Sequence, residues 1–166
     1  MTRINTIDVE FLADQHLRAE YLEYMFAIDA IQKSFKSRKL EGIPGNYVLG
    51  TGHILFFKDK LLYLKNRHEL IKEELRRRGF TNLHLTLDFK DLPNFLFNDW
   101  MPKLDDILVN FDRVYQRVML KPEWYRYYRK ELPVWFIDRE LYRDRVTRPY
   151  LFKGGTNVSE STLSTS

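Results

Sequence analysis

A histidine and two glutamates near the start of the chain have the spacing of side chains that share one helix face. His16, Glu20 and Glu23 are separated by four and then three residues, which brings them close to one line at about 100° per residue. Two carboxylates beside an imidazole suit proton transfer. The alternative is an ordinary solvated polar face, because glutamate side chains are exposed in most proteins. The spacing alone leaves both interpretations open.

A second set of residues suited to chemistry mixes cations with aromatic rings. Residues 113–153 carry 11 Lys or Arg and 5 Asp or Glu, a net charge of +6, whereas the whole chain has +4. The same region holds 10 aromatic residues, among them the run Trp124-Tyr125-Arg126-Tyr127-Tyr128. Cations beside stacking surfaces are typical of nucleic-acid binding. Alternatively, the rings close a hydrophobic core and the arginines form its solvated rim.

Composition limits the class of protein. The 166 residues, 44% hydrophobic and 30% charged, fit one globular domain. The absence of cysteine excludes disulfide scaffolds, thiolate metal sites and cysteine nucleophiles. No apolar stretch reaches the ~18–20 residues of a membrane span, and residues 1–14 have no hydrophobic signal core. We therefore expect a soluble cytoplasmic protein.

Three amphipathic helices are predicted to position these residues. The first covers residues 15–36 with Asp14 as N-cap, because apolar residues follow at intervals of 4, 3, 4 and 3, namely Leu17, Tyr21, Tyr24, Ile28 and Ile31. The second begins at Asp59 and ends at Gly79, and the third runs from about Pro102 to Leu120. The third helix carries Arg113 and Arg117 one turn apart, outside its apolar stripe.

The connections are predicted to be irregular. Residues 80–99 read mostly as a loop, and the Gly/Ser/Thr-rich residues 154–166 as a disordered tail. The predicted fold is therefore mainly α, a compact single domain over residues 1–153 with about three principal helices.

Several short motifs together resemble one enzyme family. They are Met1-Thr2-Arg3-Ile4-Asn5 and residues 13–17, 19–21, 49–53, 56–57, 59–61, 78–80 and 122–128. Their order and letters strongly resemble the phage pyrimidine-dimer DNA glycosylases, also called phage-type endonuclease V, over residues 2–130. The resemblance implies a mainly α-helical enzyme without metal or cofactor. Such an enzyme cuts the glycosidic bond of a cyclobutane pyrimidine dimer and then breaks the strand as an apurinic/apyrimidinic lyase.

The resemblance also assigns the catalytic residues. Because Thr2 is small, we expect Met1 to be removed, and the new α-amine has a reference pKa of about 7.7–8.0. In the family this amine attacks the sugar C1′, and a protonated Schiff base then permits β-elimination. The catalytic glutamate of the family aligns with Glu23, which would stabilise the iminium and assist proton movement.

Further residues are implied to contact the substrate, damaged double-stranded DNA. Positions that line or adjoin the DNA-facing site are Arg3, Gln15, His16 and Tyr21, and phosphate-gripping positions on a basic helix are Arg113 and Arg117. The run from Trp124 to Tyr128 is expected either to face the lesion or to seal the core. We expect a monomer without an obligate protein partner, phage-encoded in a bacterial host or associated with a bacterial nucleoid.

The chain departs from the family pattern in two places. The family glutamate is commonly flanked in the order Arg-Glu-Leu-Pro-Arg, whereas this chain has Leu22-Glu23-Tyr24-Met25-Phe26. Residues 132–153 extend beyond the family's usual end, either as a DNA-contacting lobe or as a cover over the core. Two other functions therefore stay open: a glycosylase/lyase for another damaged or modified pyrimidine, and a catalytically inactive DNA-binding module.

Overall fold

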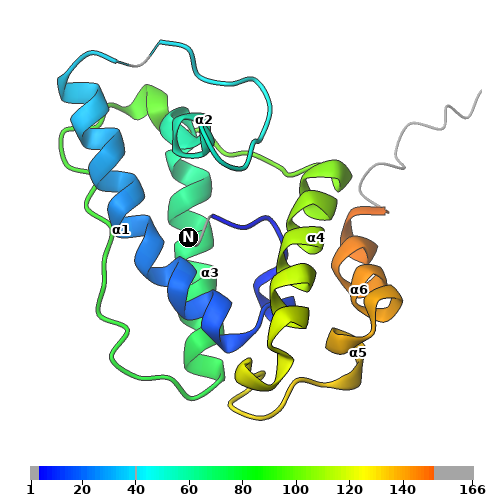
Figure 1. Ribbon diagram of the computed structural model, residues 1–166. Helices are drawn as coiled ribbons and strands as arrows, with labels where there is room; N and C mark the ends of the chain where they lie inside the picture. The colour runs from blue at the N-terminus through cyan, green and yellow to red at the C-terminus, as the bar shows by residue number, and fades with distance from the viewer. Residues whose placement is uncertain (1–3, 40, 152–166) are drawn as a thin grey trace, which may run out of the picture.

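The computed structural model describes residues 4–39 and 41–151 (Figure 1). Its helices are α1 (Asp14–Lys36), α2 (His53–Phe56), α3 (Leu61–Arg77), α4 (Leu104–Leu120), α5 (Val134–Ile137) and α6 (Arg139–Leu151). Short 3-10 turns lie at η1 (Val9–Phe11), η2 (Phe57–Asp59), η3 (Asn94–Leu96) and η4 (Pro122–Trp124). The described residues contain no strand, which confirms the mainly α fold. None of their helices is long and apolar enough to cross a membrane.

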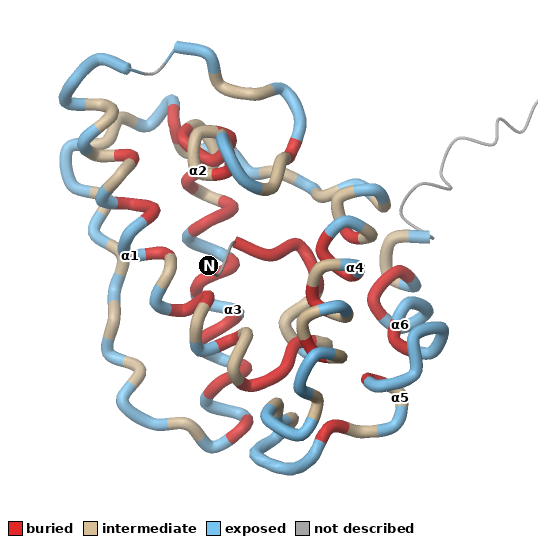
Figure 2. The backbone as a smooth tube through the Cα atoms, in the orientation of Figure 1, coloured by how far each residue is buried: buried red, intermediate tan, exposed pale blue. Residues whose placement is uncertain are grey.

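The three predicted helices are confirmed as α1, α3 and α4. The side chains of the predicted α1 stripe are all buried, namely Leu17, Tyr21, Tyr24, Ile28 and Ile31. Residues 80–99 form a loop apart from η3, as predicted. In Figure 1, α1 and α4 stand on either side of the N-terminal segment, and α3 lies behind it. Figure 2 shows this segment as a continuous buried stretch between half-exposed helices.

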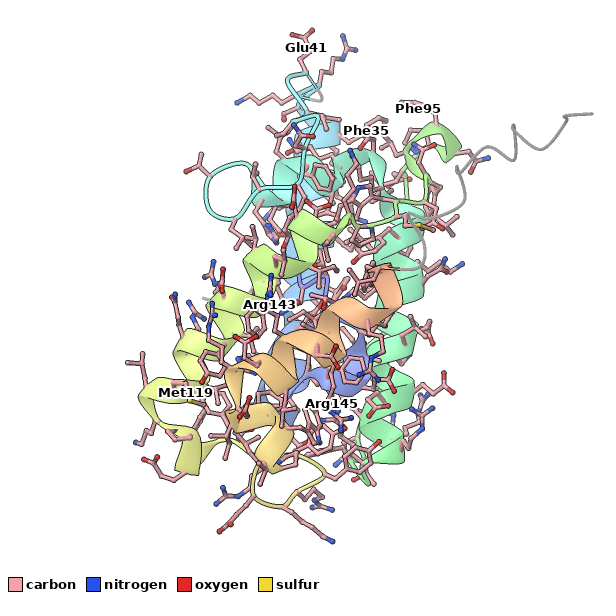
Figure 3. The ribbon with its side chains drawn as sticks, turned by 90° about the vertical axis from the view of Figure 1, so that its right-hand side faces the viewer. Phe35, Glu41, Phe95, Met119, Arg143 and Arg145 are labelled. Atoms are coloured by element: carbon pink, nitrogen blue, oxygen red, sulfur yellow. The ribbon has the colours of Figure 1, made fainter. Side chains whose placement is uncertain are left out.

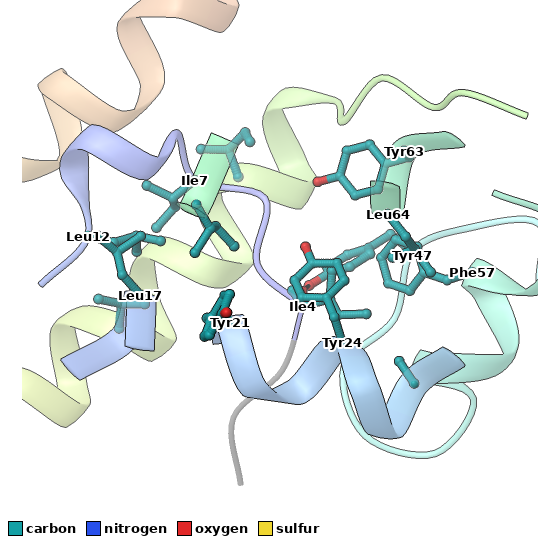
Figure 4. Close-up of a cluster of buried hydrophobic side chains, with 14 of the residues drawn as sticks. Ile4, Ile7, Leu12, Leu17, Tyr21, Tyr24, Tyr47, Phe57, Tyr63 and Leu64 are labelled. Atoms are coloured by element: carbon teal, nitrogen blue, oxygen red, sulfur yellow. Dashed lines mark hydrogen bonds between the residues drawn. The ribbon is translucent and has the colours of Figure 1, made fainter. Parts of the chain in front are cut away.

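Residues 4–7 are buried without regular secondary structure, so side chains must satisfy their backbone polar groups. The Ile4 N–H donates to Nε2 of His53 at 3.0 Å, and the Ile4 carbonyl accepts from the Tyr47 hydroxyl at 2.9 Å. His53 Nδ1 lies 2.7 Å from the Val48 carbonyl. Because a carbonyl only accepts, Nδ1 carries the proton and Nε2 is free to accept. Figure 4 shows Ile4 near the rings of Tyr24 and Tyr47.

A buried ion pair holds the next part of the segment. Arg67 Nε lies 2.7 Å from Glu20 Oε1, and both side chains are almost fully buried. The same Glu20 oxygen accepts the Asn5 N–H at 3.0 Å, while Arg67 Nη2 donates to the Ile7 carbonyl at 2.8 Å. These bonds, with those to Ile4, are called the N-terminal clamp below. The solvated-face interpretation is therefore wrong for Glu20, because Arg67 and Asn5 replace its water.

The start of α1 also differs from its prediction. The helix includes Asp14, and the side chain of Asp14 does not cap it. The carboxylate instead accepts the N–H groups of Tyr128 and Arg129, at 3.2 and 2.8 Å, and pairs with the buried Arg78 at 2.9 Å. The N-cap prediction is wrong because a distant turn and Arg78 compete for the same oxygens. This carboxylate fixes the loop after α4 to the start of α1.

The sequence did not predict α5 and α6, which occupy the extension. The ring of Tyr142 stacks on Phe136 at 4.3 Å, and its hydroxyl donates to the Phe11 carbonyl at 2.8 Å. Figure 3 shows α6 in front of α4, against which it packs, with Arg143 and Arg145 labelled on it. Through the buried ring of Tyr142 the extension covers the core. Arg143 and Arg145 are exposed, and a DNA contact by these cations stays a prediction. The predicted tail, residues 154–166, lies outside the described residues.

Breaking the ion pair should strongly destabilise the fold. We expect Glu20→Ala to lower the free energy of unfolding by about 3–5 kcal/mol, because it leaves Arg67 buried without its partner. Urea denaturation measures this difference. The matched control is Asp29→Ala on the same helix, which removes the exposed pair with Lys33 and should cost at most about 0.5 kcal/mol. Equal losses for the two variants would contradict the clamp.

Candidate active site

A small cavity opens between α1, α4 and the N-terminal segment. Its volume is about 30 Å³, and its lining residues are Asn5, His16, Glu20, Asn110, Arg113, Val114 and Arg117. The helical spacing explains the convergence, because one turn separates the two residues from α1 and one turn separates the two arginines from α4. Three residues with predicted DNA contacts therefore meet where the clamp holds Asn5.

Of the two predicted catalytic residues, Thr2 and Glu23, the structure describes Glu23. Thr2 and Arg3 lie outside the described residues, so the structure does not place them. Glu23 is half-exposed on α1 and follows the buried Glu20 by three residues, which puts it about one turn further along the helix. The face predicted from spacing thus contains one carboxylate that belongs to the clamp, Glu20, and one that is half-exposed, Glu23.

His16 is held as a neutral side chain. Its ring stacks on Tyr125 with centroids 5.0 Å apart and an angle of 14° between the planes. Its Nδ1 is buried and has no hydrogen-bond partner among the described residues. Burial, aided by the positive charge of Arg117, lowers the pKa of His16 to about 4. At neutral pH His16 therefore offers a hydrogen-bonding ring and no charge.

Gln15 positions the loop that carries the exposed tryptophan. Its amide nitrogen donates to the Trp124 carbonyl at 2.7 Å, and its amide oxygen accepts the Arg126 N–H at 2.9 Å. Trp124 packs edge-to-face on Tyr125 and is itself exposed, as is Arg126. A direct DNA contact by Gln15 stays a prediction, and the structure gives it this supporting role.

Tyr21 lies in the core, away from the exposed residues. Its hydroxyl accepts the Leu85 N–H at 2.8 Å, and its ring stacks on His68 with centroids 5.1 Å apart. Tyr21 is buried. Tyr21 therefore joins α1 to the loop after α3 and to His68. A contact between Tyr21 and DNA stays a prediction.

The aromatic run Trp124–Tyr128 was expected either to face the lesion or to seal the core, and its members differ in this respect. The hydroxyl of Tyr127 donates to the Glu10 carbonyl at 2.8 Å, and that of Tyr128 donates to Glu74 at 2.9 Å. The guanidinium of Arg78 lies 4.6 and 4.8 Å from the two ring centroids. These two tyrosines therefore anchor the loop, whereas Trp124 remains available to a ligand.

Sequence reasoning missed three supporting residues: Tyr47, His53 and Arg67. His53 ends the run 49–53 that resembles the family, but the resemblance assigned it no role. Gly52 before it has a φ of +90°, a conformation that favours glycine. Nothing in the local sequence distinguishes Arg67 from the exposed cations of α3, because its burial depends on Glu20. The site thus combines a fixed chain segment, a half-exposed carboxylate, a neutral imidazole and two arginines, a set suited to a phosphate-bearing substrate.

The lowered pKa of His16 predicts a pH-dependent stability. Between about pH 6.5 and pH 4, the unfolded chain takes up a proton that folded His16 does not, so stability falls as the pH decreases. We expect His16→Gln to remove about 3 kcal/mol of this fall, measured by urea denaturation at pH 7 and pH 4. His84→Gln, at an exposed position, is the matched control substitution. The same pH dependence in His16→Gln and the parent would contradict a His16 ring that stays neutral in the folded protein.

A comparison with protein families agrees with this geometry. A family model described as pyrimidine dimer DNA glycosylase matches residues 1–88, which is more than half of the 166 residues. The matched part contains the N-terminal clamp, Glu23 and both α1 and α3. The arginines of α4 and the aromatic run lie beyond it. The chain belongs to the pyrimidine dimer DNA glycosylase family.

Proposed function

We propose that this protein excises pyrimidine dimers through the α-amine of Thr2, exposed by removal of Met1, and then cleaves the strand as an abasic-site lyase. The proposal adds a mechanism and a second activity to the DNA glycosylase activity that the family implies. The single observation that carries it is the N-terminal clamp, because a catalytic terminus must be held in place beside the groups that assist it.

The proposed steps balance as follows. The neutral amine forms a bond from its nitrogen to C1′, and the C1′–N1 bond breaks with its electron pair leaving on the base, which takes up a proton. Opening of the sugar ring at O4′ then gives a protonated Schiff base. Removal of a proton from C2′ drives rupture of the C3′–O bond, so the 3′ phosphate departs with its electron pair. No oxidant, metal or cofactor takes part in these steps.

Chain geometry supports the reach of the amine. Residues 4 and 5 are bonded to His53 and Glu20, and Asn5 lines the cavity with both arginines of α4. Three residues of chain span at most about 10 Å. A chain end tethered at Asn5 has a reach of about this length, which supports the proposed attack beside the cavity.

Glu23 has the environment that the proposed role needs. Glu20 is committed to Arg67 and Asn5, whereas Glu23 is half-exposed on the same side of α1. A carboxylate open to the substrate stabilises a cationic iminium and accepts protons. We assign catalysis to Glu23 and the support of the chain terminus to Glu20.

The DNA contacts divide into charge and stacking. Arg113 and Arg117 present guanidinium groups at the cavity, and guanidinium groups bind phosphate in a bidentate manner. The exposed Trp124 and Arg126 lie on the loop that Gln15 holds. We propose that the enzyme binds damaged duplex DNA as a monomer, with an extruded nucleotide at this site.

Borohydride trapping tests the amine. The untagged protein should give a covalent adduct on a duplex with one cyclobutane thymine dimer. A protein with two additional residues at its N-terminus should give no adduct, because its α-amine is displaced. An abasic-site duplex runs in parallel. An adduct on the abasic duplex alone would keep the lyase activity and indicate that the excised base is another damaged pyrimidine. No adduct on either duplex would favour a DNA-binding module and contradict the proposal.

Replacing Glu23 tests the carboxylate. We expect Glu23→Gln to lower kcat on the dimer duplex by at least about 100-fold, the usual size of a general acid–base contribution, while KM changes little. Steady-state strand cleavage over a range of duplex concentrations measures both constants. Glu140→Gln, on an exposed carboxylate of α6, is the control and should behave as the parent. Unchanged cleavage by Glu23→Gln would remove Glu23 from the mechanism.

A further inference from the structure

A second and larger cavity borders the N-terminal segment. Its volume is about 450 Å³, and it opens between Thr6 and Asp8 of the segment, α3, the loop before α4 and the end of α6. It has none of its described lining residues in common with the small cavity of the candidate active site, and it is called the rear cavity below. Small-molecule sites usually enclose about 300–1,000 Å³, so the rear cavity has room for a small organic ligand.

Three aromatic residues line the rear cavity, namely Tyr63, Trp100 and Tyr150. The ring centroids of Tyr63 and Trp100 lie 5.0 Å apart, with an angle of 77° between the planes. The Tyr63 hydroxyl donates to the Asn5 carbonyl at 3.2 Å, and the Tyr150 hydroxyl donates to the Asp8 carboxylate at 2.8 Å. These bonds fix the rings before any ligand binds, and the faces of aromatic rings attract cations.

The charges around the rear cavity also favour a cation. Asp8 and Asp99 line it, and the one cation among its described lining residues is Arg67, whose charge is paired with Glu20. Two carboxylates therefore stay unneutralised, in a chain whose net charge is +4. One oxygen of Asp8 accepts the Tyr150 hydroxyl, and a carboxylate has about four acceptor sites, so Asp8 can accept further donors.

Apolar side chains stand exposed at the same cavity. Leu70 is 52% exposed and Met101 is 65% exposed, and both line it. Such side chains gain free energy when a ligand covers them. A bare metal ion would leave them uncovered, and the described residues contain no group of three or more His, Cys, Asp or Glu that could hold one. The matching ligand therefore combines positive charge with a hydrocarbon body.

We propose that the rear cavity binds an aliphatic diamine or polyamine, with ammonium groups bonded to Asp8 and Asp99 and methylene groups packed against Trp100 and Leu70. This site goes beyond the proposed function and does not depend on it. Duplex DNA gathers a layer of condensed cations, and an enzyme that acts on DNA works inside that layer. Because Arg67 lines the cavity and also bonds to the N-terminal segment, a bound amine holds that segment from a second side.

Calorimetric titration of the full chain with 1,4-diaminobutane at fixed ionic strength tests the binding. We expect one bound diamine per chain and no binding of 1,4-butanediol, which keeps the hydrocarbon body without its charges. Magnesium chloride at the same ionic strength should compete weakly, because the magnesium ion has no such body. Equal binding of the diol, equally strong competition by magnesium, or no saturable binding of the diamine would each overturn the site.

Two substitutions locate the bound amine. Asp8→Asn keeps an acceptor for the Tyr150 hydroxyl and should weaken diamine binding about tenfold, the size of one charge-assisted hydrogen bond. Met101→Lys adds a cation at an exposed position of the cavity and should weaken the binding as well. The matched controls are Asp88→Asn and Phe95→Lys, at exposed positions outside the lining, which should change the affinity by less than about twofold.

Amide resonances show whether the diamine reaches the N-terminal segment. In an NMR titration the amides of residues 6–8 should shift with the dissociation constant found by calorimetry, because Thr6 and Asp8 line the cavity. Equal losses of affinity in Asp8→Asn and Asp88→Asn, or shifts confined to other surfaces, would overturn the proposal. Absence of a trapped adduct in the borohydride experiment would overturn the amine mechanism and leave this site in place.

Discussion

The buried ion pair between Glu20 and Arg67 is the interaction on which the placement of the N-terminal segment depends. It joins α1 to α3 and at the same time accepts the Asn5 N–H and donates to the Ile7 carbonyl. A buried pair is stable only when its remaining donors and acceptors are satisfied, and here the chain segment satisfies them. The pair and the segment therefore require each other, which explains how four residues without secondary structure stay in the core.

A second buried network joins the start of α1 to the end of α3 and to the turn after α4. Arg78 bonds to Asp14 and Glu74, and Asp14 accepts two N–H groups from the turn after α4. Tyr128 and Arg129 in this turn have φ values of 51° and 64°, which are costly for residues other than glycine. The two bonds to Asp14 offset that cost. The clamp and this network thus fix α1 to the N-terminal segment through Glu20 and to the loop after α4 through Asp14.

The parts of the fold that were predictable are those whose signal is local. The apolar intervals of α1, α3 and α4 identified these helices because each buries one continuous stripe. Helix α6 has only Tyr142 and Val146 as large buried apolar residues among many charges, so its periodicity was too weak. The burial of Glu20 depends on a partner 47 positions away, and local spacing carries no such information. For the site, spacing grouped His16 and Glu23, but their different roles follow from tertiary contacts.

Native-state hydrogen exchange of the Ile4 and Asn5 amides tests the central claim most directly. If His53 and Glu20 hold the segment as described, both amides exchange only through global unfolding and are as protected as the buried middle of α3. Exchange at the rate of a frayed terminus, while α3 stays protected, would show that the segment opens independently. That result would contradict a fixed N-terminal segment over residues 4–7.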